Sequence, residues 1–183
     1  MSKSVYLAGP DVFLVDAMDV GQRKRAMCRE FGFEGIFPLD QDSDLQDDPA
    51  EIFRANCALM ERADAGLFNL SNFRGPSADA GTVFELGFLF AQGKPVYGYS
   101  SSVGNYLDRV SALEGSLVKQ EGRFLDGNGY AVEDFGLIDN LMIVRAIEDA
   151  GGSVVTVEEK DGEPLAAFRA LRETLAILRS RLD

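Results

Sequence analysis

The chain has 183 residues, of which 46% are hydrophobic and 26% charged, proportions that suit one globular domain with its own core. Its formal net charge of −12 disfavours anionic partners, so neither a nucleic-acid polymer nor a membrane surface is expected to bind it. The sequence contains no histidine, which excludes Ser-His-Asp catalysis and His-ligated metals and leaves acid–base chemistry to Asp, Glu, Tyr, Lys, Ser or Cys.

The apolar runs and the cysteines of the chain indicate where the protein is located. No run of about 18 apolar residues is present, so no transmembrane helix is expected. Residues 1–13 contain only a short apolar run that breaks at Gly9-Pro10, which is typical of a first strand rather than a signal peptide. Cys28 and Cys57 lack metal-ligand spacing and are expected to be buried thiols, so a reducing, cytoplasmic location is predicted.

Short apolar runs alternate with helical patterns along the chain. Strands are expected at residues 4–9, 33–39, 65–70, 94–100 and 151–159. Helices are expected at Asp16–Phe31, at Ala50–Arg62 after Pro49, between the loop of residues 71–81 and the strand at 94–100, and at Pro164–Leu182. Residues 101–139 show no regular pattern. The acidic loop at residues 40–49 is interpreted as a solvated connection, because it lacks the Gly and Glu of an EF-hand calcium loop.

This alternation predicts an α/β fold, in which helices cover both faces of a parallel sheet. Five strands favour a flavodoxin-like, doubly wound five-stranded parallel sheet of order 2-1-3-4-5, as a single domain over residues 1–183. Ligands of such sheets bind beyond the carboxyl ends of strands one and three. The loops expected there are residues 8–13 (AGPDVF) and residues 71–81 (SNFRGPSADAG), and the second leads into the helix that carries Glu85.

Glu85 is the unusual residue of that helix, because apolar side chains surround it and no Lys or Arg follows until Lys94. An ionised carboxylate in apolar surroundings is costly unless it is paired, hydrogen-bonded or needed for function. Arg74 is a candidate partner for a structural ion pair. Tyr6 on the first strand is either a core residue only or the hydrogen-bond donor to Glu85, since a buried phenol needs a partner.

The start of the same helix offers further candidates. Asp79 stands where an Asp side chain can cap free backbone N–H groups, so capping and catalysis both remain open for it. Gly81 and Thr82 add little bulk and would let a ligand approach closely. Gly87 weakens a helix interior and is interpreted as a close-packing position. Neither GxGxxG nor a P-loop motif is present, so nucleotide cofactors of those kinds are not expected.

Three segments together carry a family resemblance: YLAGPDVF (residues 6–13), LSNFRGPSADAGTVFELGFLFAQGKPV (residues 70–96) and GLIDNLM (residues 136–142). In this order, over most of residues 5–145, they resemble the nucleoside 2-deoxyribosyltransferase family. The resemblance implies a flavodoxin-like fold and a glutamate nucleophile on the helix after the Asp. The chain lacks the aromatic residue that some members place beside Phe13, and it has a longer insertion at residues 101–139.

The resemblance also implies roles for single residues. Glu85 would attack C1′ of the deoxyribose, Tyr6 would hold Glu85 in place, and Asp79 would assist departure and return of the base. Asn56 lies where other members carry a second base-contacting Asp, and Asn140 matches an asparagine that reaches the sugar hydroxyls from a neighbouring subunit. The further substrate-binding positions are Gly9, Asp11, Phe13, Arg74 and Gly81.

The chemistry of these residue types agrees with that reading. A glycosidic C–N bond breaks through an oxocarbenium-like state, which an adjacent carboxylate stabilises and can trap covalently. A base leaves readily only when it receives a proton, which a second carboxyl group can deliver. The predicted function is therefore nucleoside salvage by base exchange between 2′-deoxyribonucleosides and free purine or pyrimidine bases. A homo-oligomer with shared active sites is expected, and no metal, flavin or nicotinamide cofactor is required.

Two alternatives stay open. A 2′-deoxynucleoside 5′-monophosphate N-hydrolase would use water in place of the second base and would need hydroxyls and cations for the phosphate, for which Arg74 and Ser77 are candidates. A non-catalytic nucleotide-sensing module would bind deoxynucleosides without turnover. The joint presence of Glu85, Tyr6 and Asp79 argues against the module.

Overall fold

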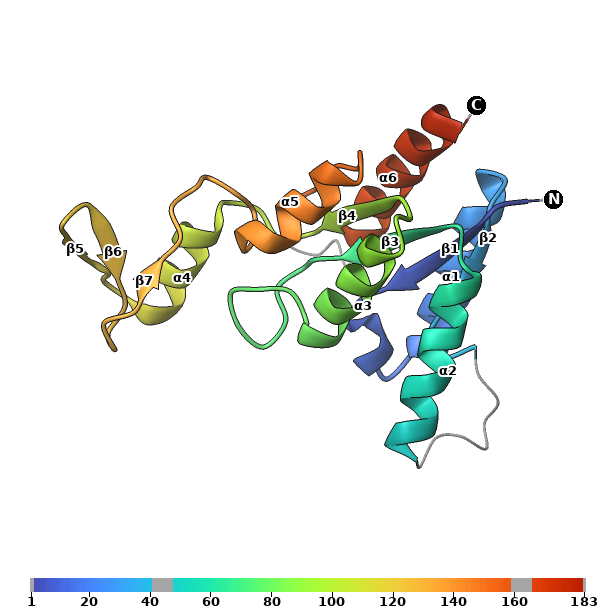
Figure 1. Cartoon of the computed structure of the whole chain (residues 1–183), viewed down its shortest axis with the longest axis horizontal. Coiled ribbons are helices and arrows are strands. Elements are labelled where there is room, and N and C mark those ends of the chain that lie inside the picture. The colour runs from blue at the N-terminus through green and yellow to red at the C-terminus, as the bar shows by residue number, and fades with distance from the viewer. Residues whose placement is uncertain (1, 41–47, 159–165, 183) are drawn as a thin grey trace.

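A computed structural model describes residues 2–40, 48–158 and 166–182. In this part of the chain, five parallel strands form a sheet of order β2-β1-β3-β4-β8 (Figure 1). The strands are β1 (Ser4–Ala8), β2 (Glu34–Ile36), β3 (Ala65–Asn69), β4 (Val96–Ser100) and β8 (Val154–Thr156). Each lies within a predicted run, and their order along the sheet is 2-1-3-4-5. The predicted flavodoxin-like, doubly wound sheet is confirmed.

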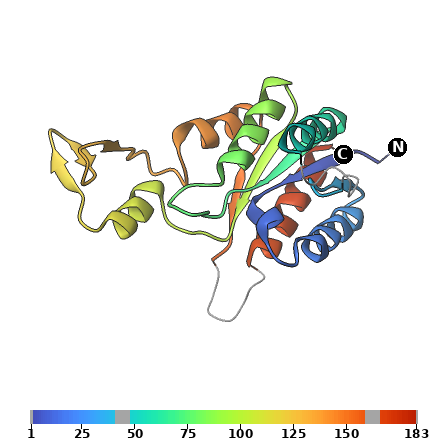
Figure 2. The ribbon, with the colours of Figure 1, turned by 90° about the horizontal axis from the view of Figure 1, so that it is seen from below.

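Helices cover both faces of this sheet (Figure 2). One face carries α1 (Ala17–Glu30) and α6 (Ala166–Leu182), and the other carries α2 (Pro49–Arg62), α3 (Ala80–Ala91) and α5 (Leu141–Asp149). Side chains of a strand alternate between the two faces. Val5 and Leu7 of β1 therefore pack with α1 and α6, whereas Tyr6 and Ala8 pack with α3 and α5. This alternation directs Tyr6 toward the helix that carries Glu85.

The insertion that showed no regular pattern forms a projection, called here the arm (residues 106–132). It consists of α4 (Tyr106–Glu114) and an antiparallel sheet of β5 (Val118–Gln120), β6 (Arg123–Leu125) and β7 (Ala131–Val132). Figures 1 and 2 both show it extending away from the five-stranded sheet. Large apolar side chains on the arm remain exposed, among them Leu113 (63%), Val118 (61%) and Tyr130 (74%).

Several smaller expectations can be compared with the structure. Residues 41–47 of the acidic loop and residues 164–165 of the closing helix lie outside the described residues. Cys28 is a buried free thiol as predicted, but Cys57 is only partly buried. The close-packing interpretation of Gly87 is wrong, because this glycine is exposed and a Cβ there would meet no atom within 4 Å. None of the helices in the described ranges is long and apolar enough to span a bilayer.

Candidate active site

The carboxyl ends of β1 and β3 lie side by side, as the strand order requires. Gly9 directly follows β1 and is the N-cap of a short 3-10 helix, η1 (Pro10–Phe13). A Cβ on Gly9 would lie 2.6 Å from the Cβ of Asn69 and 2.5 Å from Oδ2 of Asp11, so only glycine permits this close approach. The two loops predicted to form a crevice are therefore brought together.

Glu85 and Tyr6 meet at this end of the sheet. The Tyr6 hydroxyl donates a hydrogen bond of 2.6 Å to Oε1 of Glu85, and Tyr6 is fully buried. Burial is the main cause that raises the pKa of Glu85 to about 7; the Tyr6 hydrogen bond opposes the rise and the charge of Asp79 adds to it. Burial and the neighbouring Glu85 also raise the pKa of Tyr6, which keeps the phenol protonated as a donor. The ion pair considered between Glu85 and Arg74 is not formed among the described residues.

Asp79 is the N-cap of α3. Its Oδ2 accepts hydrogen bonds from the backbone N–H of Thr82 at 2.9 Å and from the Thr82 hydroxyl at 3.2 Å. The capping geometry is thus present, while Oδ1 does not take part in these two bonds. A Cβ on Gly81 would lie 3.0 Å from Oδ2 of Asp79, so glycine leaves room beside the cap. The charge of Asp79 raises the pKa of Glu85.

Asp11 is held by side chains that the sequence did not single out. Its Oδ2 accepts hydrogen bonds from Nζ of Lys24 at 2.5 Å and from Nδ2 of Asn69 at 3.0 Å. Lys24 is only 2% exposed, and its Nζ also donates to the Tyr99 hydroxyl at 2.9 Å. Burial lowers the pKa of Lys24, and the charge of Asp11 opposes this shift. In the sequence, the burial of Lys24 is indicated only by its spacing. It lies four residues after Val20 on α1, and therefore on the same buried face of the helix.

Aromatic side chains and Arg74 lie at the rim of the two loops. Phe13 is 57% exposed and stacks on Phe73, with 5.1 Å between ring centroids and 13° between ring planes. The Arg74 guanidinium carbon lies 4.6 Å from the Phe73 centroid and 5.4 Å from the Phe13 centroid. Arg74 adopts φ 55°, a left-handed conformation that is uncommon outside glycine. The structure therefore brings Arg74 to Phe13 rather than to Glu85.

The two predicted asparagines lie on different helices. Asn56 is partly buried on α2, next to Cys57. Burial raises the pKa of the Cys57 thiol, and the charges of Glu61 and Glu85 add to this rise. Asn140 caps α5: its Oδ1 accepts from the backbone N–H of Met142 at 3.0 Å, and its Nδ2 donates to Glu133 at 2.7 Å. Asn140 also lines a pocket of about 360 Å³ beside the arm. The amide of Asn140 is thus engaged within its own chain.

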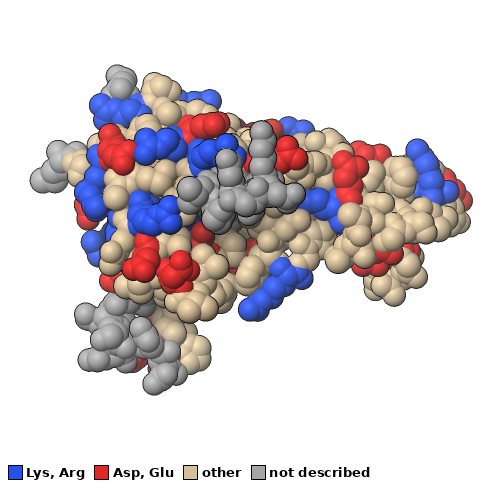
Figure 3. Space-filling model, turned by 180° about the vertical axis from the view of Figure 1, so that it is seen from behind, with Lys and Arg blue, Asp and Glu red and all other residues tan. Residues whose placement is uncertain are grey.

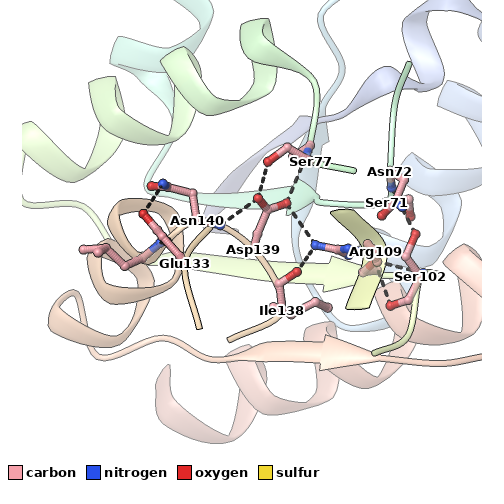
Figure 4. A network of polar contacts seen from close by, with 12 residues as sticks. Ser71, Asn72, Ser77, Ser102, Arg109, Glu133, Ile138, Asp139 and Asn140 are labelled. Atoms are coloured by element: carbon pink, nitrogen blue, oxygen red, sulfur yellow. Dashed lines mark hydrogen bonds and ion pairs between the residues drawn. The ribbon is translucent and has the colours of Figure 1, made fainter. Parts of the chain in front are cut away.

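A second buried ion pair was also missed by the sequence analysis. Asp139 and Arg109 form it, with 3.6 Å between Oδ2 and Nη2, next to Ser77 (Figure 4). No spacing in the sequence signals this pair, since 30 residues separate its members. Within residues 2–40, 48–158 and 166–182, no group of three or more Cys, Asp and Glu side chains could hold a metal ion.

Comparison with known proteins shows the family and the fold of this chain. An uncharacterised protein of Schizosaccharomyces pombe is 30% identical over 195 residues, which cover 97% of this chain and 90% of that protein. A 2-desoxiribosyltransferase from Leishmania mexicana is 27% identical with a TM-score of 0.64, over 93% of this chain and 97% of that one. A conserved protein from Enterococcus faecalis shares the fold, at 18% identity and a TM-score of 0.56, over 97% and 99% of the two chains. The nucleoside 2-deoxyribosyltransferase model matches residues 5–142, and the chain belongs to this family.

Proposed function

We propose that this protein exchanges the base of 2′-deoxyribonucleosides through a covalent deoxyribosyl–Glu85 intermediate. The observation that carries the proposal is the hydrogen bond of 2.6 Å from the buried Tyr6 hydroxyl to Glu85. That bond fixes one carboxylate oxygen and leaves the other to react. Apolar surroundings keep the carboxylate poorly hydrated and therefore nucleophilic.

In the first step, a carboxylate oxygen of Glu85 bonds to C1′ while the bond from C1′ to the base nitrogen breaks. The electron pair of that bond goes to the base, and a proton from the Asp79 carboxyl group neutralises it. In the second step, a nitrogen of the incoming base attacks C1′, the ester bond to Glu85 breaks, and a proton returns to Asp79. Two inversions give retention at C1′.

A 2-deoxy sugar suits this route. The missing 2-hydroxyl would otherwise withdraw electrons, so positive charge at C1′ costs less in its absence. Asp11 is held by a buried Lys24 and Asn69, which makes it a fixed acceptor for a sugar hydroxyl. The exposed face of Phe13 would stack on the base, and Arg74 would contact the base beside it. Gly9 and Gly81 would provide space, and Asn56 would contact the base from α2.

The test is incubation with 2′-deoxyinosine, with and without free adenine, followed by chromatography of the products. Deoxyadenosine that forms only when adenine is present supports base exchange. Free deoxyribose without a new nucleoside would indicate hydrolysis instead, and binding without any product would indicate a sensing module. For a 5′-monophosphate, Ser77 is a poor ligand because its hydroxyl already donates to Asp139.

We further infer that the protein works in cytoplasmic nucleoside salvage as a homo-oligomer in which Asn140 reaches the crevice of a neighbouring subunit. The exposed apolar side chains of the arm, together with Met142 at 71% exposure beside Asn140, support such contacts. In that assembly Asn140 would exchange its bond to Glu133 for one to the sugar.

A further inference from the structure

The loop before α3 (residues 71–78) contacts the buried carboxylate of Asp139 at its carboxyl-terminal end. Asp139 has no exposed side-chain surface, and both of its oxygens are occupied. Its Oδ2 accepts from the backbone N–H of Ala78 at 2.9 Å, and its Oδ1 accepts from the backbone N–H of Asn140 at 2.8 Å and from the Ser77 hydroxyl. Ala78 is the residue directly before Asp79, so the contact holds the chain immediately next to the proposed acid.

Arg109 of the arm makes this buried carboxylate possible. Its guanidinium lies 3.6 Å from Asp139 and donates to the carbonyl of Ile138. The side chain is only 8% exposed, and no described residue accepts a hydrogen bond from its Nε or Nη1. Burying donors without partners costs free energy, so Arg109 is a poor choice if stability alone is required. Figure 4 shows the guanidinium pointing toward Ile138 and Asp139.

The other end of the same loop is fixed by the segment that leads into the arm. The hydroxyls of Ser71 and Ser101 lie 3.0 Å apart, and the backbone N–H of Ser101 donates to Ser71 at 3.0 Å. The backbone N–H of Asn72 donates to the Ser102 hydroxyl at 3.0 Å (Figure 4). Residues 71–78 are therefore bound at both ends by the residues on either side of the arm.

We propose that Asp139, held by Arg109, is a positioning residue that places Asp79 against the leaving base. The inference rests on the proposed function, in which Asp79 delivers the proton. Asp79 cannot move independently of Ala78, because its carboxylate is tied to α3 through Thr82 and its backbone to the fixed loop. A small displacement of an acid relative to its target lowers the rate steeply, whereas binding of the sugar elsewhere is unaffected.

The experiment compares two substrates that differ in their need for a proton. Guanine needs one in order to leave 2′-deoxyguanosine, but 7-methylguanine leaves from its cationic 2′-deoxynucleoside without one. Asp139→Asn should lower kcat for 2′-deoxyguanosine about 10–100-fold and for the 7-methyl compound less than about 3-fold, with KM nearly constant. Ser77→Ala should show the same selectivity to a smaller extent and serves if Asp139→Asn fails to fold. Asp134→Asn, an exposed change in the same segment, is the matched control.

Coupling to Asp79 provides the second measurement. The Asp139→Asn/Asp79→Asn double variant should be no slower on 2′-deoxyguanosine than Asp79→Asn alone, because Asp139 affects the reaction only through Asp79. Equal losses on both substrates in Asp139→Asn and Ser77→Ala, while Asp79→Asn remains selective, would overturn the positioning role and leave the proposed function intact. If Asp79→Asn itself slows both substrates equally, its role as the acid fails, and the positioning role fails with it.

Discussion

Glu85 lies in a partly buried position that raises its pKa to about 7, and this sets the pH dependence of the reaction. The nucleophile must be ionised, and its pKa is raised to about 7, so kcat/KM for a substrate whose base leaves without a proton from Asp79 should increase as pH rises through about 7. Tyr6→Phe removes the hydrogen bond that lowers this pKa and should move the midpoint upward. Asp79→Asn removes the charge that raises it and should move the midpoint downward. A pH–rate profile that both variants leave at the same midpoint would contradict the assignment.

The same titration affects stability. Because the pKa of Glu85 is higher in the folded protein than in the unfolded chain, the folded state binds more protons between pH 4.5 and 7, and the free energy of unfolding falls as pH rises through this window. The side chain of the Glu85→Gln variant stays neutral at every pH. Above pH 7 the free energy of unfolding of this variant should therefore be larger than that of the wild type by on the order of 3 kcal/mol. Urea unfolding at both ends of the window measures this, with the exposed change Glu114→Gln as control.

A covalent intermediate identifies the nucleophile directly. Glu85→Ala should abolish base exchange while the protein still folds, because the change removes a poorly hydrated carboxylate. A 2-fluoro-deoxynucleoside should form a slowly hydrolysed adduct with the wild type, and mass spectrometry of its peptides should locate the added mass at Glu85. An adduct on another residue, or exchange at the wild-type rate by Glu85→Ala, would exclude the proposed intermediate.

The contact between Tyr6 and Glu85 could be anticipated from the sequence, because each residue was conspicuous in its own element. Tyr6 lies on a buried strand with a hydroxyl to satisfy, and Glu85 lies in an apolar helix. The pair of Asp139 and Arg109 could not be found this way, because 30 residues separate them and only the packed fold brings the two charges together. Lys24 could be suspected from its place on the face of Val20, but its contacts with Asp11 and Tyr99 could not.

At the level of elements, strands of the sheet were predictable because buried parallel strands read as continuous apolar runs. The arm was not, since β5 to β7 have two or three residues each and carry mostly exposed or half-buried side chains. Helix α5 was missed although Ile143, Val144 and Ile147 form a buried stripe on it.

Lys24 of α1 joins this helix to η1 through its ion pair with Asp11. Lys24→Met should destabilise the protein by about 3–5 kcal/mol, because it leaves the Asp11 carboxylate in a mostly buried site without its cation. Adding Asp11→Asn removes that uncompensated charge, so the double variant should be more stable than Lys24→Met alone. Thermal and urea unfolding of the three variants would check this. A double variant that loses the full sum of both single effects would show that the pair does not interact.

For the whole molecule, the net charge of −12 is not spread evenly. Figure 3 shows the face covered by α1 and α6, where Lys and Arg gather away from the arm with Asp and Glu among them. Some of these charges are paired, as in Arg172 with Glu30 at 2.7 Å and Arg25 with Asp40. The net negative charge therefore belongs to the molecule as a whole, and this face carries cations as well as anions.

The proposed sharing of active sites is also a property of the whole molecule and can be tested by complementation. Glu85→Ala and Asn140→Ala proteins should each be inactive, and they are mixed after mild dissociation and then reassembled. If Asn140 serves the neighbouring crevice, each mixed dimer contains one crevice with both groups intact. Random pairing should then restore about a quarter of the wild-type activity. If Asn140 serves its own chain, every crevice keeps one defect and no activity returns. A protein that remains monomeric at the assay concentration would exclude sharing before any mixing.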